Sequence, residues 1–139
     1  MARKPFAAQI AELAEKSIEQ QRAVISASIQ DVIEAAQLPV AQGGRMPVDT
    51  GALRNSLVSE LNGSEVARGA ESYTLVAAQI EPGDTARFGW TAEYSLRVEY
   101  GFVGEDSLGR TYNQQGKFFV EGAAAQWQGI VAKNAGRLK

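Results

Sequence analysis

The chain has 139 residues, of which 45% are hydrophobic, and its 14 basic and 16 acidic residues give a formal net charge of −2. This size and composition predict a single globular domain, residues 1–139, and the lack of a basic excess argues against a nucleic-acid-binding protein. Cysteine and histidine do not occur, which excludes disulfides, thiol nucleophiles and the histidine-based forms of acid–base, triad and zinc chemistry.

Residues 1–38 are predicted to form one long helix, because apolar side chains recur mostly at steps of three and four residues. The members of this stripe are Phe6, Ile10, Leu13, Ile18, Ile25, Ile29, Val32, Ile33 and Ala36. The stripe weakens at residues 19–22, where we expect a kink or an exposed stretch, and Pro39 ends the helix before a loop at residues 40–46. Such a helix needs a partner, which the sequence leaves open as its own sheet, a neighbouring subunit or both.

Residues 47–57 predict the start of a second helix. Asp49 is a suitable N-cap, because its carboxylate can accept a hydrogen bond from a free backbone N–H at the positive end of the helix dipole. In that frame Val48 and Leu53 occupy the two positions of a hydrophobic staple. Gly51 would then lower helix stability, so it indicates that another group passes close to the backbone.

The middle of the chain predicts an antiparallel sheet. Its strands are the β-former-rich segments at residues 57–61, 73–80 and 85–91. A Pro-Gly-Asp turn at residues 82–84 would join the last two strands into a hairpin. Alternation in the third strand places Ala86, Phe88 and Trp90 on one face.

Residues 94–101 are compatible with two structures. Apolar and polar residues alternate from Tyr94 to Tyr100, which favours a strand. Leu96 and Tyr100 are also four residues apart, and Gly101 would fit a helix C-terminus. The residues alone leave both structures open.

The remaining chain predicts a loop followed by a helix. Residues 102–116 are polar and predict a long loop, a kind of segment that often carries function. Apolar spacing predicts a helix from Phe118 to about Asn134, with Gly136 after its end. The aromatic residues expected in the core, or otherwise at an interface, are Trp90, Trp127, Phe118 and Phe119. The elements together predict an α+β fold in which a long N-terminal helix and a C-terminal helix pack on a small antiparallel β-sheet.

No reactive centre emerges from the sequence. Glu105 and Asp106 are adjacent, but a metal site needs more oxygen ligands than these two, so a solvated loop is favoured. Asp49, Thr50 and Ser56 supply a carboxylate and hydroxyls without a base of suitable pKa. We therefore expect no catalytic residue, metal ligand or cofactor, and a structural or assembly protein rather than an enzyme.

Three separated segments carry a family resemblance. They are Pro47-Val48-Asp49-Thr50-Gly51-Ala52-Leu53-Arg54-Asn55-Ser56, Tyr94-Ser95-Leu96-Arg97-Val98-Glu99-Tyr100-Gly101, and Lys117-Phe118-Phe119 before an amphipathic helix. In this order they resemble the small minor tail-component, or tail-completion, family of long-tailed bacteriophages and prophages. The loop at residues 106–110 and the segment 123–127 strengthen the resemblance, which covers residues 47–132.

The resemblance implies an α+β domain and favours a helix at residues 94–100. It also implies a structural virion protein of the head–tail junction, a neck or tail-completion subunit that forms a ring, sixfold to match the tail. Its partners would be copies of itself and neighbouring neck and tail proteins (a stopper or connector, a tail terminator or the tail tube), with DNA only as passing cargo. The resemblance also implies that the chain is located in the virion. During assembly we expect it in the host cytoplasm, because neither a membrane-spanning run nor a signal sequence is evident.

A ring interface is heterologous, so each subunit must show two different patches that dock head to tail. The candidate interface residues are Asp49, Thr50, Gly51, Leu53, Arg54, Tyr94, Glu99, Tyr100, Gly101, Asp106, Arg110 and Phe118. We expect Arg54 to pair with Glu99 within or between subunits. The segment at residues 102–116 is expected to contact an adjacent ring and to become ordered on docking.

Rival interpretations stay open at this point. Within the virion, the chain could instead form the tail terminator or a head-side stopper ring. From another class, it could be a soluble regulatory or nucleic-acid-binding module that uses the N-terminal helix, against which the net charge argues. An enzyme is the third alternative, and the residue types that the chain lacks argue against it.

Overall fold

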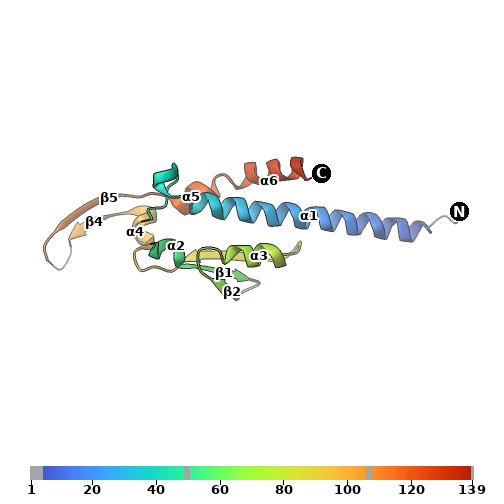
Figure 1. Ribbon diagram of the computed structural model, residues 1–139, viewed down its shortest axis with the longest axis horizontal. Coiled ribbons are helices and arrows are strands. Elements are labelled where there is room, and N and C mark those ends of the chain that lie inside the picture. Colours follow the sequence, from blue (N-terminus) through green and yellow to red (C-terminus); the bar gives the residue numbers. More distant parts are fainter. Residues whose placement is uncertain (1–4, 49–50, 106–107, 139) are drawn as a thin grey trace.

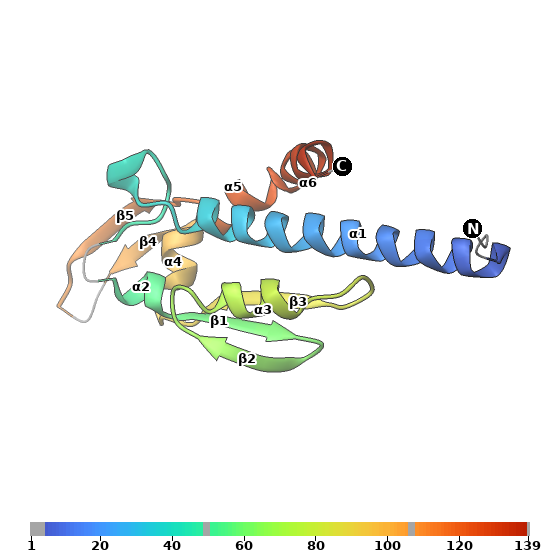
Figure 2. The ribbon, with the colours of Figure 1, turned by 45° about the vertical axis from the view of Figure 1, so that its right-hand side comes forward.

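The computed structural model describes residues 5–48, 51–105 and 108–138, and its fold is α+β, as the sequence predicts (Figure 1). A three-stranded antiparallel sheet and the helices packed on it form the body of the molecule. The long N-terminal helix projects from one end of this body, and a two-stranded ribbon projects from the other end (Figures 1 and 2). The molecule is therefore elongated, with one extension at each end.

The long helix, α1 (Phe6–Ala36), has 31 residues, which corresponds to a length of about 46 Å at 1.5 Å per residue. It continues without interruption through residues 19–22, which are exposed. The helix ends before Pro39, in agreement with the prediction. Within the described ranges, no helix is both long and apolar enough to cross a membrane.

Buried polar contacts attach the end of α1 to the sheet. The side chain of Gln37 donates to the carbonyl oxygen of Ala70 at 2.8 Å and accepts from the indole N–H of Trp90 at 3.1 Å. The following segment, predicted as a loop, contains one turn of 3-10 helix, η1 (Val40–Gln42), and then the buried Met46. The exit from α1 is therefore fixed by side chains of the body.

The sheet has the strand order β2–β1–β3, and all neighbours are antiparallel. Its strands are β1 (Leu57–Leu61), β2 (Ser64–Arg68) and β3 (Ala86–Trp90). The predicted strands include β1 and β3 but not β2. A turn at Asn62 and Gly63, with φ of 52° and 83°, joins β1 to β2; positive φ at both central residues is the geometry of a type I′ hairpin turn.

Residues 73–80 contain a helix, α3 (Tyr73–Gln79), so the predicted strand and its hairpin with β3 are wrong. The buried side chains are those of Tyr73, Val76, Ala77 and Ile80, which recur at steps of three and four residues. A helix brings all four to the core, whereas a strand would bring about half of them, so packing overrides the β propensity of the segment. The turn at residues 82–84 lies where the sequence predicts it.

The main core lies between α1, α3 and one face of the sheet. Ile29 and Ile33 of α1 pack with Leu57 of β1 and with the buried residues of α3. The residues predicted to share a face of β3, Ala86, Phe88 and Trp90, border this core. Burial of a large apolar side chain stabilises the fold by about 1.5–3 kcal/mol, so this cluster holds α1 on the body.

The segment after β3 forms a helix and a ribbon. Residues 95–100 form α4 (Ser95–Tyr100), the alternative that the resemblance favours. The predicted loop at residues 102–116 is wrong, because β4 (Gly101–Glu105) pairs with β5 (Thr111–Gln115) in an antiparallel ribbon. The ribbon projects from the body (Figure 2), so its strands do not need the apolar alternation by which half-buried strands are recognised.

The C-terminal helix is divided into α5 (Phe119–Ala124) and α6 (Trp127–Arg137), where the sequence predicts one helix. Gly136 lies inside α6 and not after its end. α6 lies along α1 on the side away from the sheet (Figures 1 and 2). The buried amide of Asn134 donates to Ser28 Oγ at 3.2 Å and to Asp31 Oδ2 at 3.0 Å, so a buried polar link joins the two helices.

Candidate interface for assembly

The first motif forms a short helix, α2 (Ala52–Asn55), whose start differs from the prediction. The N-cap position is Gly51, with φ of +82°, so Asp49 is not the N-cap and the predicted staple frame is wrong. Glycine is favoured by this positive φ, which L side chains rarely adopt. The predicted close approach of another group is also seen, because a Cβ at Gly51 would lie 3.3 Å from Nδ2 of the Asn55 side chain. Asp49 and Thr50 themselves lie outside the described residues.

The three motif segments meet in a second core, which we call the motif cluster. Leu53 of α2 and Phe119 of α5 are each 2% exposed and pack with the buried Met46. Val98 of α4 and Trp90 of β3 border them. The Trp90 and Phe119 rings meet edge to face with centroids 5.2 Å apart, a favoured aromatic geometry. Segments that are distant in the sequence thus form one packed unit.

Glu99 connects two of the motifs through its buried carboxylate. Its Oε1 accepts a hydrogen bond from the backbone N–H of Val120 at 2.9 Å, and its Oε2 accepts one from Glu121 at 2.8 Å. These N–H groups belong to the first turn of α5 and have no partner within that helix. A negative charge is also favourable at a helix N-terminus. Glu99 therefore caps a helix that follows it by 20 residues.

The predicted ion pair between Arg54 and Glu99 is not formed within the chain. Both oxygens of Glu99 bind α5, and Arg54 is exposed on α2. Among the described residues, the side-chain ion pairs are Arg22–Glu81 and Arg68–Glu65. Within the chain Glu99 therefore has a structural role, and its pairing with Arg54 of another subunit stays a prediction.

Backbone contacts join α4 to the segment before α5. The N–H of Lys117 donates to the carbonyl oxygen of Val98 at 2.7 Å, and the N–H of Phe118 donates to that of Glu99 at 3.1 Å. Gly101 ends α4 with φ of +87°, and a Cβ there would lie 2.5 Å from the carbonyl oxygen of Gln114. The second motif thus needs glycine at this position for its conformation and for the close approach of β5.

Apolar side chains remain exposed around the motif cluster, and we call this surface the motif face. Its members are Leu96 and Tyr100 on α4, Phe118, and Val120 on α5. Leu96 is 70% exposed. Phe118 has φ of 53°, which is uncommon for a non-glycine residue, and its ring meets that of Tyr100 at 6.3 Å. Contiguous exposed apolar residues of this kind are typical of interaction sites.

A groove of about 220 Å³ adjoins the motif face between β3, α4 and α5. Its apolar lining consists mainly of Phe88, Trp90, Leu96, Tyr100, Phe119 and Val120. We call it the motif groove. Such a concave, largely apolar site can receive a side chain of a partner.

The other predicted residues do not gather at one point. Tyr94 is partly exposed at the N-cap of α4. Arg110 is exposed just before β5, at the projecting end of the ribbon. Asp106 lies outside the described residues. The motif residues are therefore brought together, whereas those of the ribbon lie apart from them.

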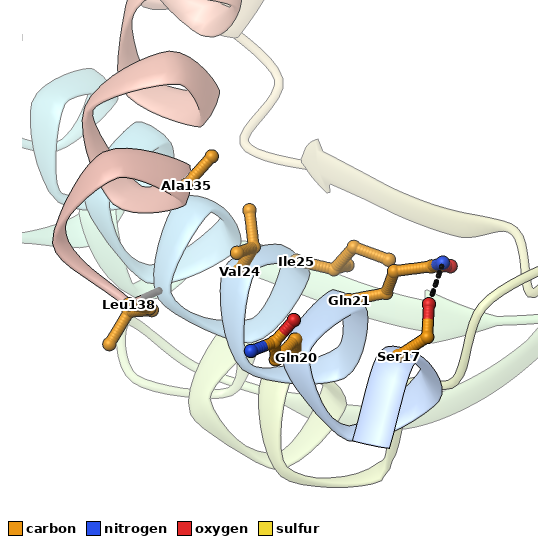
Figure 3. Close-up of a pocket in the computed structure, with 7 residues that line it drawn as sticks. All are labelled: Ser17, Gln20, Gln21, Val24, Ile25, Ala135 and Leu138. Carbon is orange, nitrogen blue, oxygen red and sulfur yellow. Dashed lines mark hydrogen bonds between the residues drawn. The ribbon is translucent and has the colours of Figure 1, made fainter. Parts of the chain in front are cut away.

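A second apolar surface lies at the opposite end of the molecule, on residues 6–23 of α1, which we call the α1 arm. Phe6 is 77% exposed, and Ile10 and Leu13 are also exposed. Where α6 ends, a groove of about 330 Å³ opens between the two helices (Figure 3). Its lining consists of Ser17, Gln20, Gln21, Val24 and Ile25 of α1, Ala135 of α6 and Leu138 just after α6. The sequence pattern includes the arm in the helix stripe but does not reveal that this half stays uncovered.

The groups with shifted pKa values in the described part of the chain lie away from the motif face. Burial raises the pKa of Tyr73 in the main core. Hydrogen bonds from Asn62 and from the backbone of Glu81 lower the pKa of Asp84, and a hydrogen bond to Glu65 raises that of Arg68. Among the described residues, no three acidic, cysteine or histidine side chains are grouped closely enough to hold a metal ion.

Comparisons of the chain with protein-family models, with curated proteins and with solved structures give no match. The features that bear on function are therefore the sequence motifs, their packing together in the fold and the exposed apolar surfaces at the two ends of the molecule.

Proposed function

We propose that this chain is a structural subunit of the head–tail junction of a long-tailed bacteriophage, where it forms a ring that completes the tail for attachment to the head. The observation that carries the proposal is the convergence of the three family-like segments. Leu53, Val98 and Phe119, one residue from each segment, belong to one cluster, and Glu99 of the second segment caps the helix begun by the third. The three segments therefore belong to one structural unit, and this supports reading them together as one family-like pattern.

The distribution of exposed apolar side chains supports an assembly role. A closed ring uses two different surfaces of each subunit, which dock head to tail. The motif face and the α1 arm lie at different ends of an elongated molecule (Figure 1). Each has large apolar residues that remain exposed in the single chain, and burial of apolar surface is the main favourable term in association.

The projecting ribbon is the proposed contact with an adjacent ring. It reaches beyond the body (Figures 1 and 2), and Val103 on β4 is exposed. A two-stranded ribbon with little packing is marginally stable by itself, so contact with a neighbouring protein would order it further. The neighbours would be a stopper or connector ring on one side and the tail terminator or tube on the other.

Passage of DNA through the ring is compatible with the charge of the chain. Phosphate binding grows with the number of cationic contacts, and the formal net charge is −2. In the proposed role DNA is cargo and not a ligand, and the subunit is not an enzyme.

The proposal is tested by disrupting the reading frame in the phage that encodes the chain. Electron microscopy of the lysate should show full heads and separate tails, because the joint between them is incomplete. The wild-type chain supplied from a plasmid should restore joined particles. Normally joined, infectious virions in the absence of the protein would contradict the proposal, and a map of the intact neck would assign the layer.

A further inference from the structure

α5 and α6 follow each other in the sequence but are held on the molecule in different ways. α5 packs through the buried apolar side chains of Phe119 and Ala123. Of the 11 residues of α6, all of which the structure describes, Asn134 alone is buried, and Ile130 and Val131 are half-buried. Because burial of apolar side chains is the dominant favourable term in folding, α6 lacks the kind of contact that fixes α5.

A buried polar cluster holds α6 on α1. The amide nitrogen of Asn134 donates to Ser28 Oγ and to Asp31 Oδ2, and its amide oxygen accepts a hydrogen bond from Arg137 at 3.2 Å. Polar groups that leave such a cluster regain hydrogen bonds with water, so the net stabilisation from each bond is small. Separation of α6 from α1 should therefore require less free energy than separation of an apolar core of the same size.

The sequence of α6 adds little stability to the helix. Isolated helices shorter than about 12–15 residues are marginal in water, and α6 has 11 residues. Gly129 and Gly136 lower its stability further relative to alanine. Among the described residues, a Cβ at either position would have no neighbour within 4 Å outside the backbone of the helix. Packing therefore does not require these glycines, and the helix depends on its contact with α1.

We propose that α6 is a displaceable strap, which opens from α1 at the link of residues 125–126 while α5 stays packed on the body (Figures 1 and 2). The face of α1 that it uncovers contains Ser28 and Asp31 and leads to the groove at the C-terminal end of the α1 arm. α6 thus controls how much of α1 is free for a contact between subunits. This use in assembly rests on the proposed function, whereas the opening is a property of the free chain.

Thiol labelling measures the opening, because the natural chain has no cysteine. Ser28→Cys places a thiol beneath α6, and the matched control, Ser59→Cys, places one between β1 and Ser72 at the start of α3. Both serines are 0% exposed and hydrogen-bonded to one neighbouring side chain or more. Each thiol can therefore react with a soluble aromatic disulfide only after an opening, and circular dichroism checks that both variants fold.

The Ser28→Cys thiol should react at least about a hundredfold faster than the Ser59→Cys thiol, and low concentrations of urea should change its rate little, because a local opening exposes little surface. Asn134→Ala added to Ser28→Cys should raise the rate about fivefold, because the polar cluster is lost. Gly129→Ala should lower it by about the same factor, because alanine favours the helix. Equal rates for the two thiols, with the same steep dependence on urea, would overturn the proposal, since α6 would then open only with the whole fold.

Hydrogen exchange of the natural chain avoids any effect of the Ser28→Cys substitution itself. The backbone amides of residues 131–137 in α6 should exchange together, and faster than those of residues 29–36 of α1, which the main core covers. Protection of α6 as strong as that of residues 29–36 would overturn the proposal.

The outcome is separable from that of the reading-frame experiment. Separate heads and tails in the disrupted phage, together with equal labelling of the two thiols, would leave the proposed function standing and reject the strap. Faster labelling of the Ser28→Cys thiol, together with normally joined particles in the disrupted phage, would reject the function and keep the strap.

Discussion

The two halves of α1 share the apolar spacing of a helix but have opposite surroundings. In the C-terminal half, Ile29 and Ile33 are buried against α3 and the sheet, and Asn134 of α6 binds the opposite side of the helix. In the N-terminal half, Phe6, Ile10 and Leu13 are exposed although they follow the same helical spacing. An apolar stripe therefore predicts that a helix will have a partner, but it does not predict whether that partner belongs to the same chain.

The largest expected difference is in the free energy of unfolding, between an isoleucine-to-alanine substitution in the C-terminal half of α1 and the same substitution in its N-terminal half. Ile33→Ala should lower the free energy of unfolding by about 2–5 kcal/mol, because it leaves a cavity in a packed core. Ile10→Ala should change it by less than about 0.5 kcal/mol in the monomeric chain, because Ile10 is 50% exposed. Urea denaturation followed by circular dichroism measures both, and equal losses would show that the arm is packed in the free chain.

The next effect concerns the motif cluster. Glu99→Gln should lower the free energy of unfolding by about 1–3 kcal/mol, because one of the two N–H groups of α5 loses its acceptor in a buried site. The control is Glu121→Gln on the exposed side of α5, which should have a much smaller effect. An unchanged free energy of unfolding in Glu99→Gln would mean that the carboxylate does not hold α4 and α5 together.

A smaller loss is expected where α6 meets α1. Asn134→Ala removes the amide that binds Ser28 and Asp31, and the expected cost is about 1–1.5 kcal/mol. Gln128→Ala, an exposed position on the same helix, serves as the control. Since the end of α6 lies beside the C-terminal end of the arm, hydrogen exchange of residues 24–31 should accelerate in Asn134→Ala and not in the control.

The smallest expected change in stability depends on pH and involves Asp84, which lies in the turn before β3 at one end of the sheet. Asn62 and the backbone of Glu81 donate hydrogen bonds to Asp84 and lower its pKa in the folded state. Because the pKa is lowered on folding, the ionised Asp84 carboxylate stabilises the folded state. This stabilisation is fully present above the pKa that Asp84 has in the unfolded chain, and it is lost as the pH falls through its pKa in the folded chain. The wild-type chain should therefore lose stability below about pH 4 more steeply than Asp84→Asn. Identical acid profiles would contradict this assignment.

Local sequence signals predict the regular and covered parts of the fold. The spacing in α1, the composition of β1 and the alternation in β3 all correspond to observed elements. In α3, however, β-forming residues concealed helical spacing at Tyr73, Val76, Ala77 and Ile80. For β2 a usable signal existed, because Asn62-Gly63 is a strong hairpin turn.

The site was only partly predictable, because its geometry depends on contacts between distant segments. The motifs identify Leu53, Glu99 and Phe118 as interface candidates, but Leu53 is core and Glu99 is a helix cap. The sequence does not predict the ribbon of β4 and β5, because a projecting ribbon needs no apolar face. The uncovered state of the α1 arm follows from where α6 ends in space, which no local pattern encodes.

Hydrogen exchange of the α1 arm, in the free chain and in the assembled particle, tests the central claim most directly. We expect rapid exchange of residues 9–23 in the free chain, strong slowing in the assembly, and little change in residues 29–36, which the body already covers. Equally rapid exchange of the arm in both states would contradict the claim that its apolar residues form a contact between subunits.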